Sequence, residues 1–78
     1  MFNILLYKKV KTKQIVYAEN NDNKLVKIPT NSFGEIKFIG LNEEYNLSYY
    51  VIQFNIDHMN CWATLNLNSF DLLEDDLK

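Results

Sequence analysis

The sequence predicts a mainly β domain, a small antiparallel barrel of five to six strands with a short C-terminal helical turn. Three observations support this fold class. Apolar and polar side chains alternate over several short segments, as in strands that bury one face. Asparagine, glycine and proline separate these segments and mark turns. The chain has only 78 residues, so its strands must close on one another or leave exposed edges, and a small barrel is the usual solution.

Three strands are expected in the first part of the chain. The first covers residues 2–10 and the second covers residues 14–19, and together they form a hairpin. The third covers residues 24–28. Residues 20–23 are a run of asparagine and aspartate, which favours a turn because these side chains tolerate left-handed backbone. Pro29 ends the third strand, since proline has no N–H to donate to a neighbouring strand.

Residues 35–39 form the next expected strand, in which Ile36 and Phe38 share one face. A turn at residues 30–34 precedes it. Gly34 is expected to supply a backbone angle in that turn that other residues resist. A polar loop at residues 40–47, which contains Glu43 and Glu44, then leads into the second half of the chain.

The clearest alternation lies in residues 48–56 and 61–67, which predict a hairpin with a tight connection at residues 57–60. One set of its side chains should face the core: Tyr50, Ile52, Phe54, Ile56, Cys61, Ala63, Leu65 and Leu67. Residues 69–77 suit one or two helical turns, which Asn68 or Ser69 would cap. Carboxylates near the end of that helix oppose its dipole, so a frayed acidic C-terminus is expected from about residue 74.

Four segments of the later half follow a pattern of known small barrels. A glycine opens residues 34–40, a tyrosine-valine-phenylalanine strand covers residues 49–54, an aromatic strand covers residues 62–65, and a short apolar segment covers residues 70–74. This succession resembles the Src-homology-3-like barrels, and the resemblance extends over residues 26–74. It implies a fold and leaves the function open, because such barrels bind peptides, bind nucleic acids or serve as structural inserts. The acidic cluster and paired tyrosines of the peptide-binding members are not found, so proline-rich ligands are not implied.

Charged residues are unevenly distributed along the chain. Residues 1–41 carry a net charge of +4 and residues 42–78 a net charge of −6, which sum to the formal charge of −2. Such asymmetry can steer encounters with a charged partner. The sequence contains no arginine and eleven asparagines. Without arginine, the chain cannot make bidentate guanidinium contacts to phosphate. The compositional bias as a whole suggests an AT-rich gene of a low-GC bacterium, a phage or another mobile element.

Composition argues against an enzyme. One histidine and one cysteine leave little acid–base chemistry at neutral pH. His58 is expected on the surface and Cys61 as a buried, inert thiol, so no catalytic residue, metal or cofactor is expected. A single cysteine favours a reducing compartment. Neither a signal peptide nor a run of about 20 apolar residues is found, so we expect a cytoplasmic protein that does not bind membranes.

The first candidate interface lies on the outward face of the predicted 48–67 hairpin. Alternation places Trp62 opposite the core, together with Thr64 and across from Tyr49, Val51 and Gln53. An exposed tryptophan beside tyrosine and valine is typical of a protein interface. The alternative is that a terminus covers this face and makes Trp62 part of the core. The sequence therefore predicts a non-enzymatic module that docks on a larger protein, as an inhibitor or accessory protein would.

The acidic end is a second candidate interface with the same kind of partner. Spaced carboxylates on a rigid surface can occupy a basic groove of another protein, whereas a plain acidic tail only aids solubility. The residues concerned are Glu74, Asp75 and Asp76, with Asp71 and with Glu43 and Glu44 expected nearby.

The alternative function is binding of nucleic acid by the first hairpin. Basic groups interleaved with aromatic ones can follow a phosphate backbone while bases stack. The candidate residues are Lys8, Lys9, Lys11, Lys13, Tyr7 and Tyr17. Alternating lysines also protect an exposed strand edge from aggregation, and this interpretation stays open beside the first. An exposed edge and an apolar N-terminus would also serve a homodimer.

Overall fold

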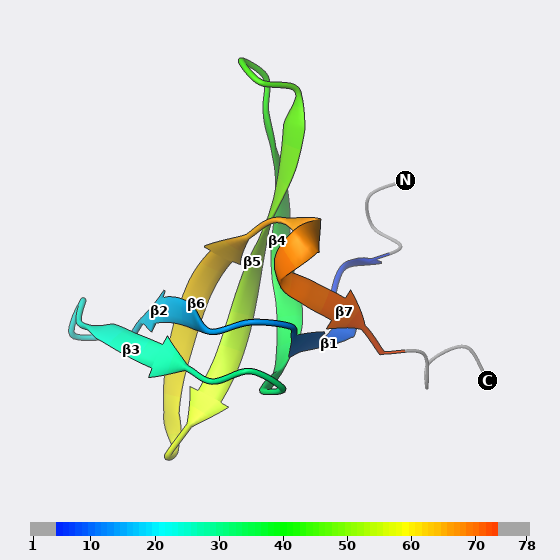
Figure 1. Ribbon diagram of the computed structural model, residues 1–78. Helices are drawn as coiled ribbons and strands as arrows, with labels where there is room; N and C mark the ends of the chain where they lie inside the picture. The colour runs from blue at the N-terminus through cyan, green and yellow to red at the C-terminus, as the bar shows by residue number, and fades with distance from the viewer. Residues whose placement is uncertain (1–4, 74–78) are drawn as a thin grey trace.

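The computed structural model describes residues 5–73, which form a single antiparallel sheet. The sheet contains seven strands within this range, in the order β3-β2-β6-β5-β4-β1-β7. The strands are β1 (Lys9–Thr12), β2 (Val16–Glu19), β3 (Leu25–Ile28), β4 (Phe33–Asn42), β5 (Leu47–Ile56), β6 (Met59–Leu65) and β7 (Phe70–Leu72), and the 3-10 turn η2 (Leu67–Ser69) precedes β7. The sheet curls strongly into an open half-barrel (Figure 1).

The mainly β, antiparallel character predicted from the sequence is confirmed. The sheet differs from the expected five- to six-stranded closed barrel, since it has seven strands over the described residues and remains open. β3 and β7 lie at its two ends and do not pair with each other. We call the concave face, which carries the core, the inner face, and the opposite face the outer face.

The expected hairpin of the first two strands does not form. β1 pairs with β4 and β7, while β2 pairs with β3 and β6. Only residues 13–15 connect β1 to β2, and such a link spans at most roughly 14 Å. The two strands stand second and sixth in the sheet order, so the curl of the sheet must bring them close together. The first strand also begins later than expected, at Lys9, because Leu5 and Leu6 pack against the core ahead of it.

The expected helix over residues 69–77 is replaced by a 3-10 turn and a strand. Asn66 caps the turn, and its side chain accepts hydrogen bonds from the backbone N of Asn68 at 2.9 Å and from the hydroxyl of Ser69 at 3.4 Å. The ring of Phe70 is then buried edge-on against Tyr50, with centroids 5.7 Å apart. That burial requires an extended backbone, which pairs with β1. The predicted frayed end from residue 74 lies outside the described residues.

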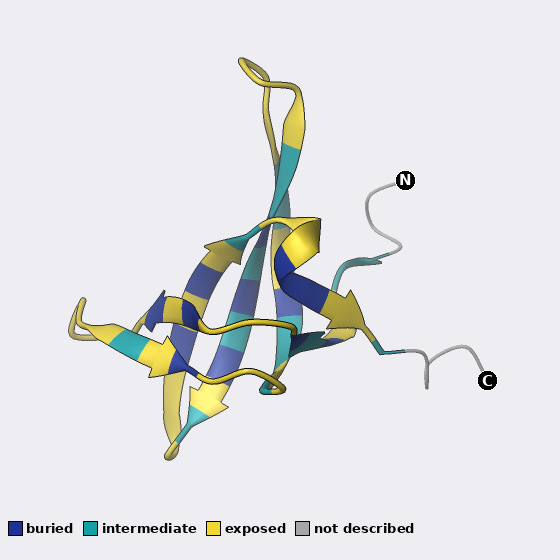
Figure 2. Ribbon diagram, viewed as in Figure 1, coloured by how far each residue is buried: buried dark blue, intermediate teal, exposed yellow. Residues whose placement is uncertain are grey.

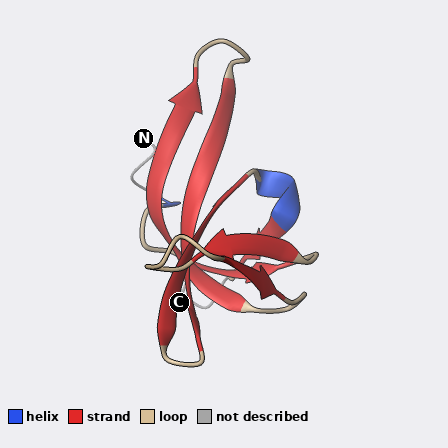
Figure 3. Cartoon of the chain, turned by 90° about the vertical axis from the view of Figure 1, so that its left-hand side faces the viewer, coloured by secondary structure: helices blue, strands red, loops and turns tan. Residues whose placement is uncertain are grey.

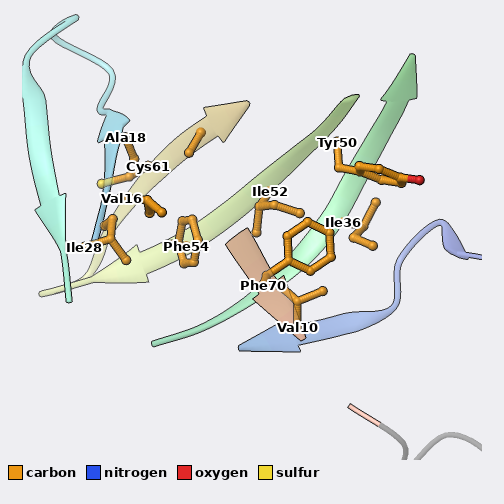
Figure 4. Close-up of a cluster of buried hydrophobic side chains, with 11 residues drawn as sticks. Val10, Val16, Ala18, Ile28, Ile36, Tyr50, Ile52, Phe54, Cys61 and Phe70 are labelled. Atoms are coloured by element: carbon orange, nitrogen blue, oxygen red, sulfur yellow. The ribbon is translucent and has the colours of Figure 1, made fainter. Parts of the chain in front are cut away.

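Within the described range, eleven buried apolar residues from all seven strands form the core on the inner face (Figure 4). They are Val10, Val16, Ala18, Ile28, Ile36, Tyr50, Ile52, Phe54, Cys61, Ala63 and Phe70. The alternation predicted for the β5–β6 hairpin is confirmed at its centre: buried residues alternate with half-buried ones in β5 and with exposed ones in β6 (Figure 2). Leu67 is the exception, because it lies in the 3-10 turn and is 50 % exposed.

A β-bulge in β4 changes the face of one aromatic residue. Ile36 lies opposite Ile52, but Phe38 lies opposite Val51, so Lys37 is an extra residue on the β4 side. The bulge reverses the alternation after it. Phe38 therefore lies on the outer face, 53 % exposed, and the prediction that it shares a face with Ile36 is wrong.

Gly34 lies inside β4 and not in a turn. Neither Gly34 nor Gly40 has a positive φ, whereas Asn31, in the turn before β4, has a φ of 69°. The expectation that Gly34 supplies an unusual angle is wrong. A Cβ at Gly34 would lie 2.7 Å from Cγ2 of Ile52 and 2.9 Å from the backbone oxygen of Gln53. Glycine is needed there for space on the inner face.

The β4–β5 hairpin forms an arm that extends beyond the rest of the sheet (Figures 1 and 3). β4 reaches Asn42 and β5 starts at Leu47, so the turn covers only residues 43–46. The polar loop expected at residues 40–47 is therefore shorter than predicted, since residues 40–42 and Leu47 belong to strands. Exposed apolar side chains occur along the arm: Leu41, Tyr45 and Leu47 are 48 %, 66 % and 63 % exposed.

Candidate functional site

Trp62 lies on the outer face at the middle of the sheet. It is opposite Gln53 of β5 on one side and opposite Glu19 of β2 on the other. Its two neighbours in β6, Cys61 and Ala63, are buried on the inner face, whereas Trp62 is 36 % exposed. Trp62 does not belong to the core cluster, so the orientation predicted from the sequence is confirmed.

Apolar side chains continue from Trp62 toward the arm. Val51 lies opposite both Thr64 and Phe38, and Tyr49 lies opposite Gly40. The rings of Phe38 and Tyr49 are in contact, with centroids 6.2 Å apart. Leu47 extends the series at the base of the turn. We call this set the outer strip: Phe38, Leu47, Tyr49, Val51 and Trp62.

Two members of the outer strip were not among the interface residues predicted from the sequence. The bulge at Lys37 turns Phe38 to the outer face, and no local sequence pattern predicts that bulge. Leu47 was assigned to a loop, although it pairs with Asn42 in the arm. The sequence did contain a signal for Leu47, since this apolar residue lies two positions before Tyr49 and so continues the outward set of residues 48–56. Thr64 and Gln53, which the sequence did predict, flank the strip on β6 and β5.

A hollow of about 490 Å³ adjoins the strip where the arm leaves the sheet. Leu47, Tyr49, Thr64 and Asn66 contribute to its walls. Among all the residues that line it, amide and hydroxyl side chains outnumber the apolar ones. The hollow therefore offers hydrogen-bonding groups beside the apolar strip.

Polar residues border the strip on its other side. A second hollow, of about 280 Å³, is lined by Lys9, Glu35, Gln53 and Asn60 among others. Lys37 lies 3.7 Å from the carboxylate of Glu35. An apolar centre beside a polar rim is the usual anatomy of a protein interface.

The residues proposed for nucleic-acid binding lie on or beside β1, apart from Tyr17. Lys11 of β1 is the cross-strand partner of Asp71 in β7. The ammonium of Lys13 lies 3.7 Å from the carboxylate of Asp71. Lys8 and Lys9 lie at the start of β1, and the ring of Tyr7 is 5.4 Å from the ammonium of Lys37. Tyr17 is in β2, opposite Lys27. The basic candidates therefore stay together around β1, and Tyr17 lies on a strand that does not pair with β1.

The acidic residues are also separated. Asp71 in β7 adjoins the beginning of β4 through β1, whereas Glu43 and Glu44 follow the end of β4. Ten strand residues lie between them, which corresponds to roughly 30 Å. Glu43 and Glu44 are therefore not near Asp71, contrary to expectation. Glu74, Asp75 and Asp76 lie outside the described residues.

No catalytic constellation is apparent in residues 5–73. His58 is exposed in the turn between β5 and β6, and Cys61 is buried at 1 % exposure, as the sequence predicted. Within the described range no three histidine, cysteine or carboxylate side chains gather as metal ligands would. The same range holds no helix with the length and apolarity needed to cross a bilayer.

Comparison with known proteins places this chain in no group. No protein-family model, no curated protein and no solved structure matches it.

Proposed function

We propose that this chain is a non-enzymatic protein-binding module that docks on a larger protein through the outer strip. The observation that carries the proposal is the series of neighbouring apolar side chains from Trp62 to Leu47 across β6, β5 and β4. Phe38, Leu47 and Trp62 are exposed, and the half-buried Tyr49 and Val51 lie between them. Aromatic and branched side chains on adjacent strands give a rigid surface, and ordering it on binding costs little conformational entropy.

The side chains exposed on the arm support a proposal for the chemistry of the partner. Leu41, Tyr45 and Leu47 are exposed on it, and Glu43 and Glu44 lie at its tip. A matching partner has a groove with an apolar floor that receives the outer strip, including Leu47, and basic residues where the tip of the arm ends. Leu41 lies opposite Ser48, on the other face of the arm, and is outside that contact. Opposite charges at the rim would increase the association rate more than the affinity.

The test uses Trp62, the single tryptophan of the chain, as both hot spot and reporter. The tagged protein is used to capture its partner from the source organism, and the captured protein is identified, purified and titrated. Binding should shift the Trp62 emission to shorter wavelength. Trp62→Ala should weaken binding at least about 30-fold, as is typical of a central aromatic anchor, while circular dichroism shows an intact sheet.

The matched control is Ile15→Ala, because Ile15 is also an exposed apolar residue, at 48 %, but lies in the link between β1 and β2. It should bind like the wild type. Phe38→Ser serves as the second variant if Trp62→Ala fails to fold. Unchanged binding by folded variants at both positions would refute the proposal.

The C-terminal carboxylates remain a second proposed contact with the same partner. Replacing Glu74, Asp75 and Asp76 together by serine should weaken binding if they reach a basic groove, and unchanged affinity would exclude them. Nucleic-acid binding by Lys8, Lys9, Lys11 and Lys13 is tested with a single-stranded thymidine oligonucleotide. A complex that forms at low salt and dissociates as salt rises would favour that function instead.

Membership in the Src-homology-3-like barrels stays a proposal at the level of fold, as does an origin in a phage or mobile element of a low-GC bacterium. An inhibitor or accessory protein encoded by such an element would need only a rigid docking surface, which is what the outer strip offers. A cytoplasmic location is proposed because the chain has a single cysteine, which suits a reducing compartment.

A further inference from the structure

We infer that β3 is a dimerisation edge, where a second copy of this chain pairs antiparallel with it around a two-fold axis at Val26. The inference is independent of the outer strip and its partner. β3 is the terminal strand of the open sheet, and among residues 5–73 only β2 forms a strand pair with it. No other element lies beyond it in the part of the chain that the structure describes (Figure 1).

The backbone groups of β3 that face this edge follow from its pairing with β2. The backbone N–H of Asn20 donates to the carbonyl of Lys24 at 3.0 Å. Hydrogen-bonded pairs alternate with non-hydrogen-bonded pairs along an antiparallel ladder. Val26 therefore directs its N–H and carbonyl toward Ala18 of β2. Leu25 and Lys27 direct theirs outward, where they can pair with another strand.

These outward groups match a second copy of themselves. An antiparallel arrangement centred on Val26 sets Leu25 opposite Lys27 of the other copy, and Lys27 opposite its Leu25. Each such pair exchanges two backbone hydrogen bonds, so the symmetric edge makes four. No residue faces its own like charge in this register.

The side chains fit the same register. Leu25 and Lys27 are on the outer face, since they lie opposite Glu19 and Tyr17 of β2. Leu25 is 71 % exposed, and the aliphatic stem of Lys27 from the second copy would cover it. The carboxylate of Glu19 follows Leu25 in the same cross-strand row, so the ammonium of that lysine would meet an opposite charge beyond the leucine.

The chain on both sides of β3 holds this strand in place. Asn20 closes the turn before β3 through its side chain, which accepts from the backbone N of Asp22 and Lys24. After β3, the carbonyl of Pro29 accepts from the hydroxyl of Thr12 at 2.8 Å. Both ends of β3 are thus held, and the strand is presented as a rigid edge. The edge is short, so the dimer should be weak and form only at high protein concentration.

The test is sedimentation equilibrium from about 10 µM to about 1 mM protein, which covers weak association. The wild type should change from monomer to dimer. Lys27→Pro should remain monomeric, because it removes an outward N–H that the folded monomer does not use. Lys27→Ala keeps that N–H and should still dimerise. A monomeric wild type at the highest concentration would overturn the inference, as would dimerisation of Lys27→Pro.

A charge exchange keeps the test decisive if proline disturbs the strand. In the dimer of Leu25→Lys, the introduced lysine of each copy lies opposite Lys27 of the other copy. These two like-charge pairs should raise the dissociation constant about tenfold. Adding Lys27→Glu to that variant restores an opposite-charge pair at both places and should restore dimerisation. A dimer formed by another surface would not respond in this reciprocal way, and failure of the rescue would refute the β3 edge without affecting the outer strip.

Discussion

The aromatic ring of Tyr49 lies over the backbone of Gly40 on the outer face of the arm. The two residues are cross-strand partners, and a Cβ placed on Gly40 would overlap the far end of the tyrosine ring. Gly40 thus leaves room for Tyr49 to lie flat along the sheet and to contact Phe38. An aromatic side chain that covers a glycine in the neighbouring strand stabilises both strands.

Gly40→Ala should displace the Tyr49 ring with little effect on stability. The overlapping atoms belong to the end of a rotatable side chain, which can turn outward. The lost contact is offset in part because alanine restricts the unfolded chain. We expect a change of less than about 1 kcal/mol in the free energy of unfolding, measured by urea denaturation. In the Tyr49→Ala background the same substitution should become stabilising, and equal effects in both backgrounds would contradict the contact.

Gly34→Ala should be far more destabilising than Gly40→Ala. The new methyl group would lie 2.9 Å from the backbone oxygen of Gln53 and 2.9 Å from Cδ1 of Phe54. Neither a backbone oxygen nor a buried ring can move away freely, so the sheet itself must shift. We expect a loss of about 2 kcal/mol in the free energy of unfolding, measured in the same denaturation series. A loss no larger than that of Gly40→Ala would contradict the close packing of the inner face at this position.

Thr12→Val should cost stability through hydrogen bonding and not through packing. Thr12 is fully buried, and its hydroxyl donates to the carbonyl of Pro29 at 2.8 Å and accepts from the backbone N of Ser32 at 2.9 Å. Valine has nearly the same shape but leaves the Ser32 N–H without that acceptor. We expect a loss of about 2 kcal/mol in the free energy of unfolding, measured by urea denaturation. Thr12→Ser keeps the hydroxyl and should lose less; the reverse order would show that the methyl group matters more.

The turn between β5 and β6 can be improved. Asp57 and His58 have φ values of 51° and 67°, and Ile56 lies opposite Met59 across them. A two-residue hairpin turn with both φ values positive favours asparagine followed by glycine. The double change Asp57→Asn and His58→Gly should raise the free energy of unfolding by about 1 kcal/mol, seen as a higher urea midpoint. His58→Val should lower it, because a β-branched residue resists a positive φ.

Sequence reasoning succeeded for those features that depend on neighbours along the chain. Inward and outward positions of Tyr50, Ile52, Trp62 and Ala63 follow from the two-residue period of a strand, and the structure confirms them. The tight connection expected at residues 57–60 is a turn at residues 57–58, shorter than predicted because Met59 already begins β6. The outward position of Trp62 therefore follows from the alternation of its own strand.

Other features depend on residues far away in the chain. Lys37 becomes a bulge only through the register between β4 and β5, and this brings Phe38 into the outer strip. Phe70 is extended because its ring packs on Tyr50, twenty residues earlier, although the local sequence favoured a helix. Local propensity was overridden by tertiary packing in both cases.

The amino-acid order alone determined the class of the sheet, the positions of most turns and the two faces of the central hairpin, because each of these follows from side-chain alternation and from residues that accept turn conformations. Tertiary structure decided which strands pair. β1 and β2 separate across the sheet, β7 joins β1, and β3 remains at an edge, since each strand pairs where its apolar side chains complete the common core, and that choice is made among distant segments.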